Sequence, residues 1–341
     1  MPPVRALWYD HHRLSLIDQR LLPGKLAVRR YRAVREVGEA IRTMVVRGAP
    51  AIGVAAAYGL ALASREAGQT PDRAAKLLRA TRPTAFDLFV GIEAVRSAWA
   101  KGEDAEEAAD RYCANVVEEC RQIGLAGAPL VPRNARLLTH CNAGALATVQ
   151  WGTALAPIRV AHERGKNPFV FVDETRPLLQ GARLTAWELG REGIPHSIIA
   201  DNSAGHFLHR GDIDAVIVGA DRIARNGDFA NKIGTYEKAV VAHENGVPFY
   251  VAAPWTTFDF GRRSGDDIPV EERSADEVLT IGPLRLAPRT SRAANPAFDV
   301  TPARYVTGFV TPAGVVAPRS VARLERSAAA RDIPRPVRGR P

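Results

Sequence analysis

Thr139-His140-Cys141-Asn142-Ala143-Gly144-Ala145-Leu146-Ala147-Thr148 is the stretch from which the fold can be inferred. The apolar run from Ala135 to Leu138 leads into it and is typical of a short buried strand. A helical pattern follows from about Leu146 to Glu163. The small residues between these two elements predict a tight strand-to-helix turn that carries a single thiol, that of Cys141.

A turn of this kind suits ligand binding. Small residues let backbone N–H groups approach a ligand closely, and a helix N-terminus favours anions. At such a position the helix dipole would lower the pKa of the Cys141 thiol and make it reactive. The alternative is a buried cysteine that packs as a small hydrophobic residue. This stretch alone leaves both interpretations open.

The alternation of strand and helix continues after Cys141. It predicts a parallel sheet covered by helices on both faces. The predicted strands are Arg136–His140, Phe169–Asp173, Ser197–Ala200, Ala215–Val218 and Phe249–Ala252. The predicted helices are Leu146–Glu163, Gln180–Arg191, Ala204–His209 and Ile233–Glu244.

Polar and reactive residues follow several of these strands. In parallel sheets, ligands bind beyond the carboxyl ends of the strands, so these turns should surround one site. The turns contain Cys141, 173–176, Asp201-Asn202, Asp221-Arg222 and Pro254-Trp255.

The chain before Gly124 follows a different pattern. Its first thirty or so residues predict a small sheet or hairpin, and the rest is helical. The predicted helices are Ala33–Val46, Ala51–Arg65, Pro71–Arg79, Ala85–Ala100 and Ala105–Gln122. The glycine-rich segment 124–129 is a plausible boundary. We therefore predict a mainly helical domain over residues 1–126 and a second domain over 127–318.

The net charge of +9 is concentrated at the C-terminus. After Pro318 the chain holds seven arginines against Glu325 and Asp332, which is more than half of the net charge. This segment, 319–341, has few large apolar residues and is predicted to be a disordered basic tail. The remaining body is only mildly basic, so we expect no nucleic-acid partner.

The composition also indicates the kind of cellular compartment in which the protein works. Three cysteines in 341 residues do not make a disulfide framework. The N-terminus lacks the layout of a signal peptide, and the longest apolar stretch, Ala49 to Ala63, is too short to span a bilayer. These features predict a soluble protein of a reducing compartment that does not associate with membranes.

Asp221 is the first candidate for acid chemistry. It follows the apolar run 216–220, which predicts a buried strand. A carboxyl group at the end of such a strand is partly desolvated, which raises its pKa toward the range of a general acid. The alternative is a simple ion pair with the neighbouring Arg222.

Three segments place a basic residue in a turn or at the start of a predicted helix. Arg47 precedes Gly48, Ala49 and Pro50, Arg82 lies in a helix-breaking turn, and Asn231-Lys232 precedes the helix from Ile233. Free backbone donors and cations at helix starts together favour a phosphate site. The sequence has no Gly-x-Gly-x-x-Gly or Walker-type loop, so we expect neither a dinucleotide nor ATP.

A metal site and a thiol–imidazole pair have weaker support in the sequence. His206 and His209 are three residues apart near Asp201, but no second cluster has suitable spacing, so we predict no metal site. His140 adjoins Cys141, but adjacent strand residues point to opposite faces, which makes a direct thiol–imidazole pair doubtful.

Taken together, these segments resemble the methylthioribose-1-phosphate isomerase family, which belongs to the wider group of initiation-factor-2B-related proteins. The resemblance covers roughly residues 5 to 318. The segments that carry it are 47–50, 81–84, 141–148, 174–184, 219–223, 231–236 and 295–302.

The resemblance implies a mainly helical N-terminal domain, a Rossmann-like C-terminal domain and a cytoplasmic homodimer that acts in methionine salvage. It implies that Cys141 is the catalytic thiol and Asp221 the catalytic acid. The implied substrate- and phosphate-binding residues are Arg47, Gly48, Ala49, Arg82, Gln180, Asn231 and Lys232.

The chain departs from the family pattern in three segments. Asp87 replaces the usual Asn, Ser203 replaces Met, and Trp255 and Thr256 lie in a loop that usually reads Ser-Thr-Phe-Asp. A lost Met and a gained Trp are expected to reshape the pocket for the methylthio group, which leaves the 5-substituent open.

The implied reaction converts 5-methylthio-D-ribose 1-phosphate into 5-methylthio-D-ribulose 1-phosphate. It needs no redox cofactor, because oxidation and reduction cancel within one molecule. Hydrogen can move from C2 to C1 through an enediol, with Cys141 as base, or as a hydride. The alternatives are isomerisation of 5-deoxyribose 1-phosphate or ribose 1,5-bisphosphate, and a non-catalytic regulatory subunit of the initiation-factor-2B type.

Overall fold

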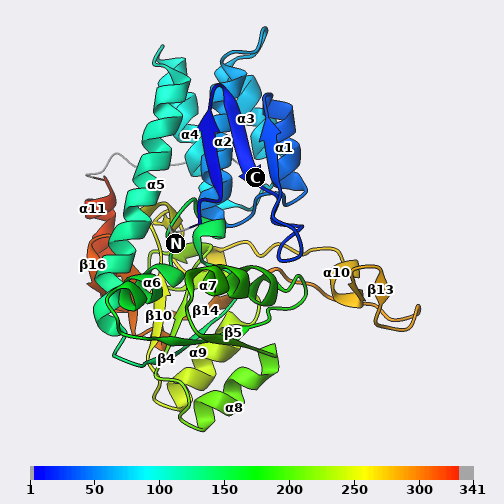
Figure 1. The fold of residues 1–341 in the computed structure, drawn as a ribbon. Coiled ribbons are helices and arrows are strands. Elements are labelled where there is room, and N and C mark those ends of the chain that lie inside the picture. The colour runs from blue at the N-terminus through cyan, green and yellow to red at the C-terminus, as the bar shows by residue number, and fades with distance from the viewer. Residues whose placement is uncertain (1–3, 330–341) are drawn as a thin grey trace.

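The computed structural model describes residues 4–329. One part consists mainly of helices and the other is built around a parallel sheet, as Figure 1 shows. Helix α5, Ala105–Gly127, extends from the first part into the second. This arrangement confirms the predicted fold class, a helical N-terminal part followed by a Rossmann-like α/β part.

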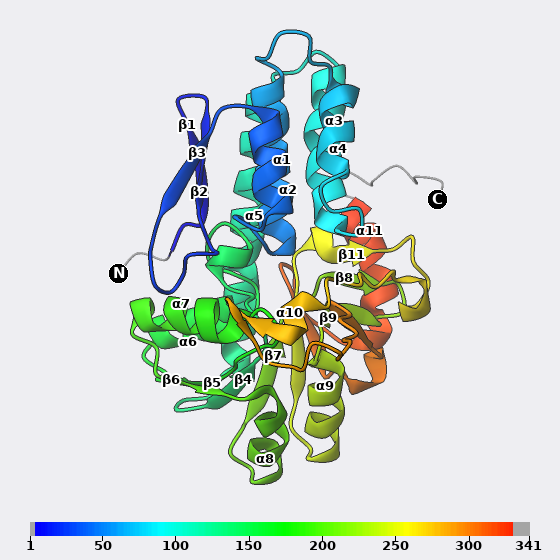
Figure 2. The same ribbon diagram turned by 90° about the vertical axis from the view of Figure 1, so that its right-hand side faces the viewer.

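A three-stranded antiparallel sheet lies beside the helices (Figure 2). It consists of β1 (Leu7–Asp10), β2 (Arg13–Ile17) and β3 (Val28–Tyr31). Leu14 and Leu16 of the central strand are fully buried in the helical core. The predicted small sheet is confirmed.

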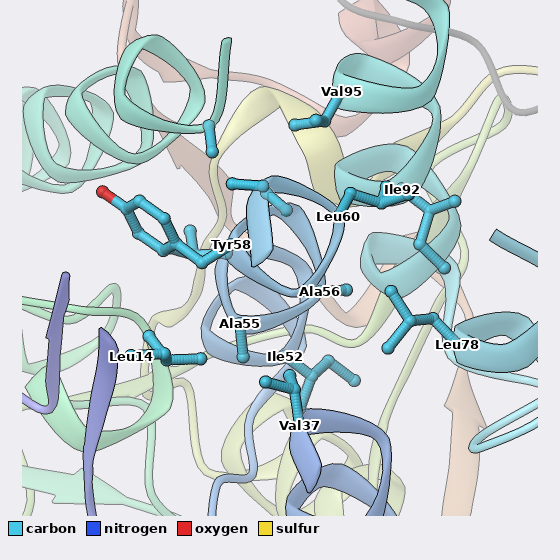
Figure 3. Close-up of a cluster of buried hydrophobic side chains, with 14 of the residues drawn as sticks. Leu14, Val37, Ile52, Ala55, Ala56, Tyr58, Leu60, Leu78, Ile92 and Val95 are labelled. Carbon is cyan, nitrogen blue, oxygen red and sulfur yellow. The ribbon is translucent and has the colours of Figure 1, made fainter. Parts of the chain in front are cut away.

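Helix α2, Ala49–Ala63, is the centre of the helical part. It is apolar on all sides, so it is stable only when surrounded, and every residue from Pro50 to Ala63 is buried. Figure 3 shows its side chains, among them Ile52 and Leu60, packed against residues of neighbouring elements. The surrounding helices are α1 (Val34–Arg42), α3 (Pro71–Arg79), α4 (Phe86–Ala100) and α5.

Glycine makes the closest helix contact feasible. A Cβ atom on Gly91 of α4 would lie 2.2 Å from the carbonyl oxygen of Gly53 in α2. The two helices therefore approach more closely here than side chains would allow, which fixes the N-terminal ends of α2 and α4 next to each other.

The main sheet has seven strands in the order β16-β15-β10-β7-β4-β5-β6, and all but β16 are parallel. All five predicted strands are confirmed within one residue at each end, whereas β15 and β16 were not predicted. The strands are β4 (Arg136–Thr139), β5 (Phe169–Asp173), β6 (His196–Ile199), β7 (Ala215–Val218), β10 (Phe249–Ala252), β15 (Gly308–Thr311) and β16 (Gly314–Val316).

Helices cover both faces of this sheet, as predicted. Neighbouring strand residues alternate between the faces, so Leu137 and Leu138 of β4 belong to different core clusters. On one face lie the end of α5, α6 (Leu155–Glu163) and α7 (Ala186–Glu192). On the other lie α8 (Ala204–His209), α9 (Thr235–Glu244) and the start of α11 (Leu324–Ala329).

The helix predicted from Leu146 to Glu163 is wrong in its first half. Only the short 3₁₀ turn η2, Ala145–Ala147, forms there, and α6 begins at Leu155. Trp151 and Gly152 have φ values of 70° and 85°, which end any regular right-handed helix. Cys141 therefore does not lie at the N-terminus of a long helix.

The segment predicted as a helix from Gln180 begins irregularly. It contains the π-helical turn η3, Gly181–Thr185, and continues as α7. A π-helical turn inserts an extra residue into the helix, a feature that is frequent at functional sites.

A second, smaller sheet was not predicted. Its order is β11-β8-β9-β14, and it lies between the main sheet and the helical part (Figure 2). Lys232 ends β9 and faces Phe298 of β14 in the register. The strands are β8 (Arg222–Ala224), β9 (Phe229–Lys232), β11 (Phe258–Asp259) and β14 (Phe298–Thr301).

One segment projects from the body. It consists of α10 (Asp276–Leu279) and a hairpin of β12 (Thr280–Ile281) and β13 (Leu284–Arg285), at the right of Figure 1. Ile281 and Leu284 in this hairpin are exposed.

The prediction of a disordered tail from residue 319 is wrong for its first part. Pro318–Arg323 forms a 3₁₀ helix and α11 follows. Val321 is fully buried against the main sheet, and this apolar anchor orders the segment. The rest of the predicted tail, from 330, lies outside the described residues. Between 4 and 329, no helix has the length and apolar character needed to cross a membrane.

Candidate active site

The sequence-predicted site residues surround one cavity between the helical part and the carboxyl ends of the sheet strands. The cavity and the pocket that adjoins it share Cys141 and Asp221 in their walls. Lining the cavity are Arg47, Gly48, Ala49, Arg82, Cys141, Gln180, Asp221 and Lys232, while Asn231 lines the adjoining pocket.

Cys141 lies two residues after the end of β4 and is 8% exposed. Its φ of 63° is unusual for a residue with a side chain. Two hydrogen bonds hold it there: its N–H donates to Thr175 Oγ1 at 2.9 Å, and its carbonyl oxygen accepts from Thr185 Oγ1 at 2.7 Å. The backbone at the thiol is therefore fixed by two threonines of the neighbouring β5–α7 segment.

Burial raises the pKa of the Cys141 thiol, although the positive charges of Arg47 and Lys232 oppose this effect. The predicted lowering of this pKa by a helix dipole is wrong. The helix expected next to Cys141 starts only at Leu155, and desolvation outweighs the nearby cations. Burial therefore favours the thiol form of Cys141 over the thiolate.

Asp221 lies three residues after the end of β7, and its N–H donates to the carbonyl oxygen of Ala230 at 2.9 Å. Burial raises the pKa of its carboxyl group, against the opposing effect of Lys232, Arg82 and Arg47. The predicted direction of this shift is confirmed. A carboxyl group with a raised pKa can act as a proton donor.

Lys232 brings a positive charge to the same cavity. Its Nζ donates to the carbonyl oxygen of Ala297 at 2.7 Å and lies 4.7 Å from the centre of the Phe298 ring. Burial lowers its pKa, whereas the negative forms of Cys141 and Asp221 would raise it. The three groups are therefore electrostatically coupled.

Arg47 and Gly48 bring the start of α2 to the cavity. Gly48 has a φ of 95°, and a Cβ atom there would lie 2.4 Å from Ala147 Cα, so only glycine fits between α2 and the turn after Cys141. Arg47 donates from Nη1 to Asn142 Oδ1 at 2.6 Å and from Nη2 to the carbonyl oxygen of Asn142 at 2.9 Å. The guanidinium is thus tied to the residue that follows the thiol.

The remaining predicted residues contribute polar groups from two further directions. Arg82 donates to Glu271 at 2.9 Å. Gln180 is buried, and within residues 4–329 its side-chain oxygen has no hydrogen-bond partner. The Asn231 amide donates to Thr235 Oγ1 at 2.9 Å. An unpaired buried acceptor such as that of Gln180 fits a ligand hydroxyl.

Sequence reasoning missed the group that supports Asn142. The Asn142 amide donates to Glu188 at 2.9 Å and to Thr185 at 3.1 Å, which orients its oxygen toward Arg47. Glu188 is fully buried, accepts the N–H of Ala145 at 2.7 Å and pairs with Arg159 at 2.5 Å. Glu188 is far from this turn in the sequence, so no local sequence pattern indicated the contact.

The wall of the cavity also has an apolar region. It contains Met44, Ile52, Phe86, Leu178, Ile268 and Phe298. Ser203 and Trp255 are not among the lining residues of the cavity, and Trp255 is buried in the core beside Phe258. The expectation that these two substitutions reshape the pocket is therefore wrong.

One set of described residues could in principle ligate a metal, and it does not include His206 or His209, the two histidines considered from the sequence. It combines His140, Asp173 and Asp201. The ammonium group of Lys238 lies 3.2 Å from Asp173 Oδ2, so this set already pairs with a cationic side chain.

Comparison with known proteins gives one consistent result. The model of the initiation factor 2 subunit family matches residues 45–318. A relative from Roseiflexus castenholzii, named methylthioribose-1-phosphate isomerase, is 51% identical over 335 residues, which cover 92% of this chain and 95% of the relative.

Two solved structures are also similar. The 5-methylthioribose 1-phosphate isomerase from Pyrococcus horikoshii has a TM-score of 0.87 and 44% identity, with 97% of each chain covered. A structure described as translation initiation factor eIF-2B subunit delta from A. fulgidus has a TM-score of 0.82 and 44% identity, covering 96% of this chain and 99% of that one.

Asp87 lies behind the cavity, in the first turn of α4, and is fully buried. Its Oδ1 accepts a hydrogen bond from Thr256 Oγ1 at 2.5 Å, and its Oδ2 has no partner within residues 4–329. Two of the positions that depart from the family pattern thus contact each other. Burial raises the pKa of Asp87 to about 7, and the negative form of Asp221 adds to this shift.

This shift predicts a pH-dependent stability. Because the folded protein keeps a proton that the unfolded chain releases, the free energy of unfolding should fall as pH rises from about 4 to about 7. Asp87→Asn cannot ionise and keeps an acceptor for Thr256. We expect the free energy of unfolding of this variant to exceed that of the unmodified protein by roughly 1–3 kcal/mol at about pH 8, and by much less at about pH 5.

Urea unfolding across this pH range measures the effect, with Asp72→Asn, an exposed carboxylate in α3, as the control. If the free energies of unfolding of Asp87→Asn and of the unmodified protein changed in parallel with pH, the raised pKa of Asp87 would be contradicted.

Proposed function

The chain belongs to the methylthioribose-1-phosphate isomerase family, within the initiation factor 2 subunit family, and on this basis we propose that it isomerises 5-methylthio-D-ribose 1-phosphate to 5-methylthio-D-ribulose 1-phosphate. The observation that carries the proposal is the meeting of Cys141, Asp221 and Lys232 in one largely apolar cavity. The reaction is an intramolecular oxidation and reduction that belongs to methionine salvage.

The 1-phosphate binds among the cationic groups of the cavity. Arg47 and Lys232 approach it from two sides, and the start of α2 at Gly48 and Ala49 offers backbone donors. Arg82 and Asn231 complete the polar side. The free acceptor of Gln180 receives a sugar hydroxyl.

The 5-methylthio group takes the apolar side, near Met44 and Leu178. A second phosphate there would need additional unpaired cations. Arg273 pairs with Glu271 at 3.0 Å and with Glu277 at 2.5 Å, and Arg222 pairs with Asp259 at 3.4 Å. This pairing favours an apolar 5-substituent over ribose 1,5-bisphosphate.

Asp221 opens the sugar ring. The anomeric phosphate blocks spontaneous opening, so the ring oxygen must gain a proton, and Asp221 is the half-buried acid in the cavity wall whose pKa is raised. As the proton arrives, the bond from C1 to the ring oxygen breaks and its electron pair stays on that oxygen, which becomes a hydroxyl. C1 is left as an oxocarbenium centre that the ester oxygen of the phosphate stabilises.

A hydride then moves from C2 to C1, and the C2 hydroxyl returns a proton to Asp221. C2 is oxidised to the ketone and C1 is reduced, so the carboxyl group is restored without a cofactor. We prefer this route to an enediol because burial raises the pKa of Cys141 and so disfavours the thiolate that would act as base, and the phosphate of a bound substrate would disfavour the thiolate further. The polarisable sulfur supports the cationic carbon in a site shielded from water.

The alternative is a regulatory subunit of the initiation-factor-2B type. The A. fulgidus structure, which is described as such a factor, has a similar fold. A binding subunit has no need for a buried thiol and a proton-donating carboxyl group in one cavity, so the cavity favours the enzyme. We further propose that the protein is a cytoplasmic homodimer, as its family membership implies.

The two reacting groups give the first test. Cys141→Ala and Asp221→Asn should each lower turnover of 5-methylthioribose 1-phosphate by at least about 100-fold, because each removes a group that acts on the reacting atoms. NMR of the ketose phosphate measures turnover, and Cys113→Ala, which removes a thiol remote from the cavity, is the control. Near-normal turnover in either variant would overturn the role of that residue.

Arg47→Ala should weaken substrate binding by roughly 1.5–3 kcal/mol through loss of a charge-assisted contact with the phosphate. The Michaelis constant should rise while the unfolding midpoint stays close to normal. Arg111→Ala, on the exposed side of α5, is the matched control. An unchanged Michaelis constant for Arg47→Ala would remove Arg47 from the phosphate site.

The hydrogen route is tested in deuterated water. Hydride transfer carries the C2 hydrogen directly to C1, so the product should contain no solvent deuterium at C1. Deuterium at that carbon would instead support an enediol with a base at C2, and the preference for a neutral Cys141 would then be wrong.

A further inference from the structure

His140 is a buried ionisable residue that the proposed mechanism does not use, although it directly precedes Cys141. It is 1% exposed. Its Nε2 lies 2.8 Å from the carbonyl oxygen of Ile233, and its Nδ1 lies 3.0 Å from Asp173 Oδ2. Both ring nitrogens are thus engaged by protein groups, which excludes direct binding of substrate by either of them.

The contact with Ile233 joins two separate parts of the site. Ile233 follows Lys232, so its carbonyl group belongs to the turn that presents Asn231 and Lys232 to the cavity. Gly234 comes next, with a φ of 97°, and a Cβ atom there would lie 3.2 Å from His140 Cε1. The imidazole therefore packs directly against this turn and bonds to it.

The protonation of the imidazole follows from its partners. A carbonyl oxygen only accepts, so Nε2 must carry a hydrogen. The carboxylate oxygen of Asp173 also accepts, so a proton lies between it and Nδ1. Lys238 Nζ is 3.2 Å from the same oxygen and also pairs with Asp173. The ring is consequently held from both sides in one orientation.

We propose that His140 is a positioning residue that couples the turn carrying Cys141 to the turn that follows Asn231 and Lys232 at the end of β9. The coupling sets the position of the Lys232 ammonium relative to the thiol, on the two sides of the space where the substrate binds. The effect of this coupling on catalysis rests on the proposed function. Its effect on the binding of an anion at Lys232 does not.

Two substitutions separate the contacts of His140. A glutamine amide nitrogen reaches about as far as His Nε2, so His140→Gln can still donate to Ile233. An asparagine amide nitrogen matches His Nδ1, so His140→Asn can donate to Asp173 but does not reach Ile233. In both variants Lys238 still pairs with Asp173. His209→Gln, at the end of α8, is the control.

The proposal predicts different results for the two variants. His140→Asn should raise the Michaelis constant and the dissociation constant of inorganic phosphate about three- to tenfold, the value of one lost hydrogen bond. His140→Gln should stay within about twofold of the unmodified protein in both. A buried residue with only a structural role would lower the unfolding midpoint in both variants without this split.

Calorimetry with inorganic phosphate and the NMR turnover assay are done on the full chain. Equal phosphate binding by the two variants would overturn the proposal, as would weaker binding by the glutamine variant. If His140→Asn does not fold, the glutamine variant decides: normal binding supports the coupling through Ile233, and loss of binding overturns it. If the unmodified protein binds phosphate but does not isomerise the substrate, the proposed function fails while the phosphate comparison still tests the coupling.

Discussion

Desolvation of charged groups is the constraint on which the rest of this structure depends. Cys141, Asp221 and Lys232 line one cavity, and burial shifts the pKa of each in the direction that favours its neutral form. The opposite signs of these groups limit the shifts, because each stabilises the ionised form of its neighbour. Burial therefore favours the protonated form of Asp221 and the thiol form of Cys141, while the cationic side chains around them favour an anion.

The fold maintains this arrangement with rigid contacts around the cavity. Parallel strands end at one edge and deliver Cys141 and Asp221, while the second sheet delivers Lys232. The start of helix α2 lines the cavity on the side of the helical part. It can approach the turn after Cys141 only because Gly48 lacks a side chain. Buried Glu188 and His140 then fix the two turns from behind.

Much of this could be predicted from the sequence, and the failures have physical reasons. Strands such as Phe169–Asp173 are short apolar runs with polar ends, so pattern alone locates them. The second sheet was missed because β8 and β9 contain the polar residues Arg222, Asn231 and Lys232, which interrupt the apolar pattern of a strand. The order of residues 319–329 was missed because it depends on Val321 meeting a distant core.

The chemistry of the candidate site was more visible than its electrostatics. The residue types that can bind phosphate or donate protons lie in recognisable turns, and the structure brings all nine of the predicted residues to one place. The direction of the Cys141 pKa could not be inferred, because it depends on how much water the completed fold excludes. The contacts of Asn142 with Glu188 and of Asp87 with Thr256 join residues far apart in sequence and leave no local pattern.

Helix α5 has a consequence for how substrate enters. Its 23 residues form a continuous rod of about 35 Å, and it contributes Val116 to the helical core and Ile123 to the core of the main sheet. A hinge movement between the two parts would have to bend this rod or separate one of its two packed faces. We therefore expect the sugar phosphate to be admitted by local displacement of the segment around Ile268 and Pro269, which lines the cavity and belongs to no helix or strand.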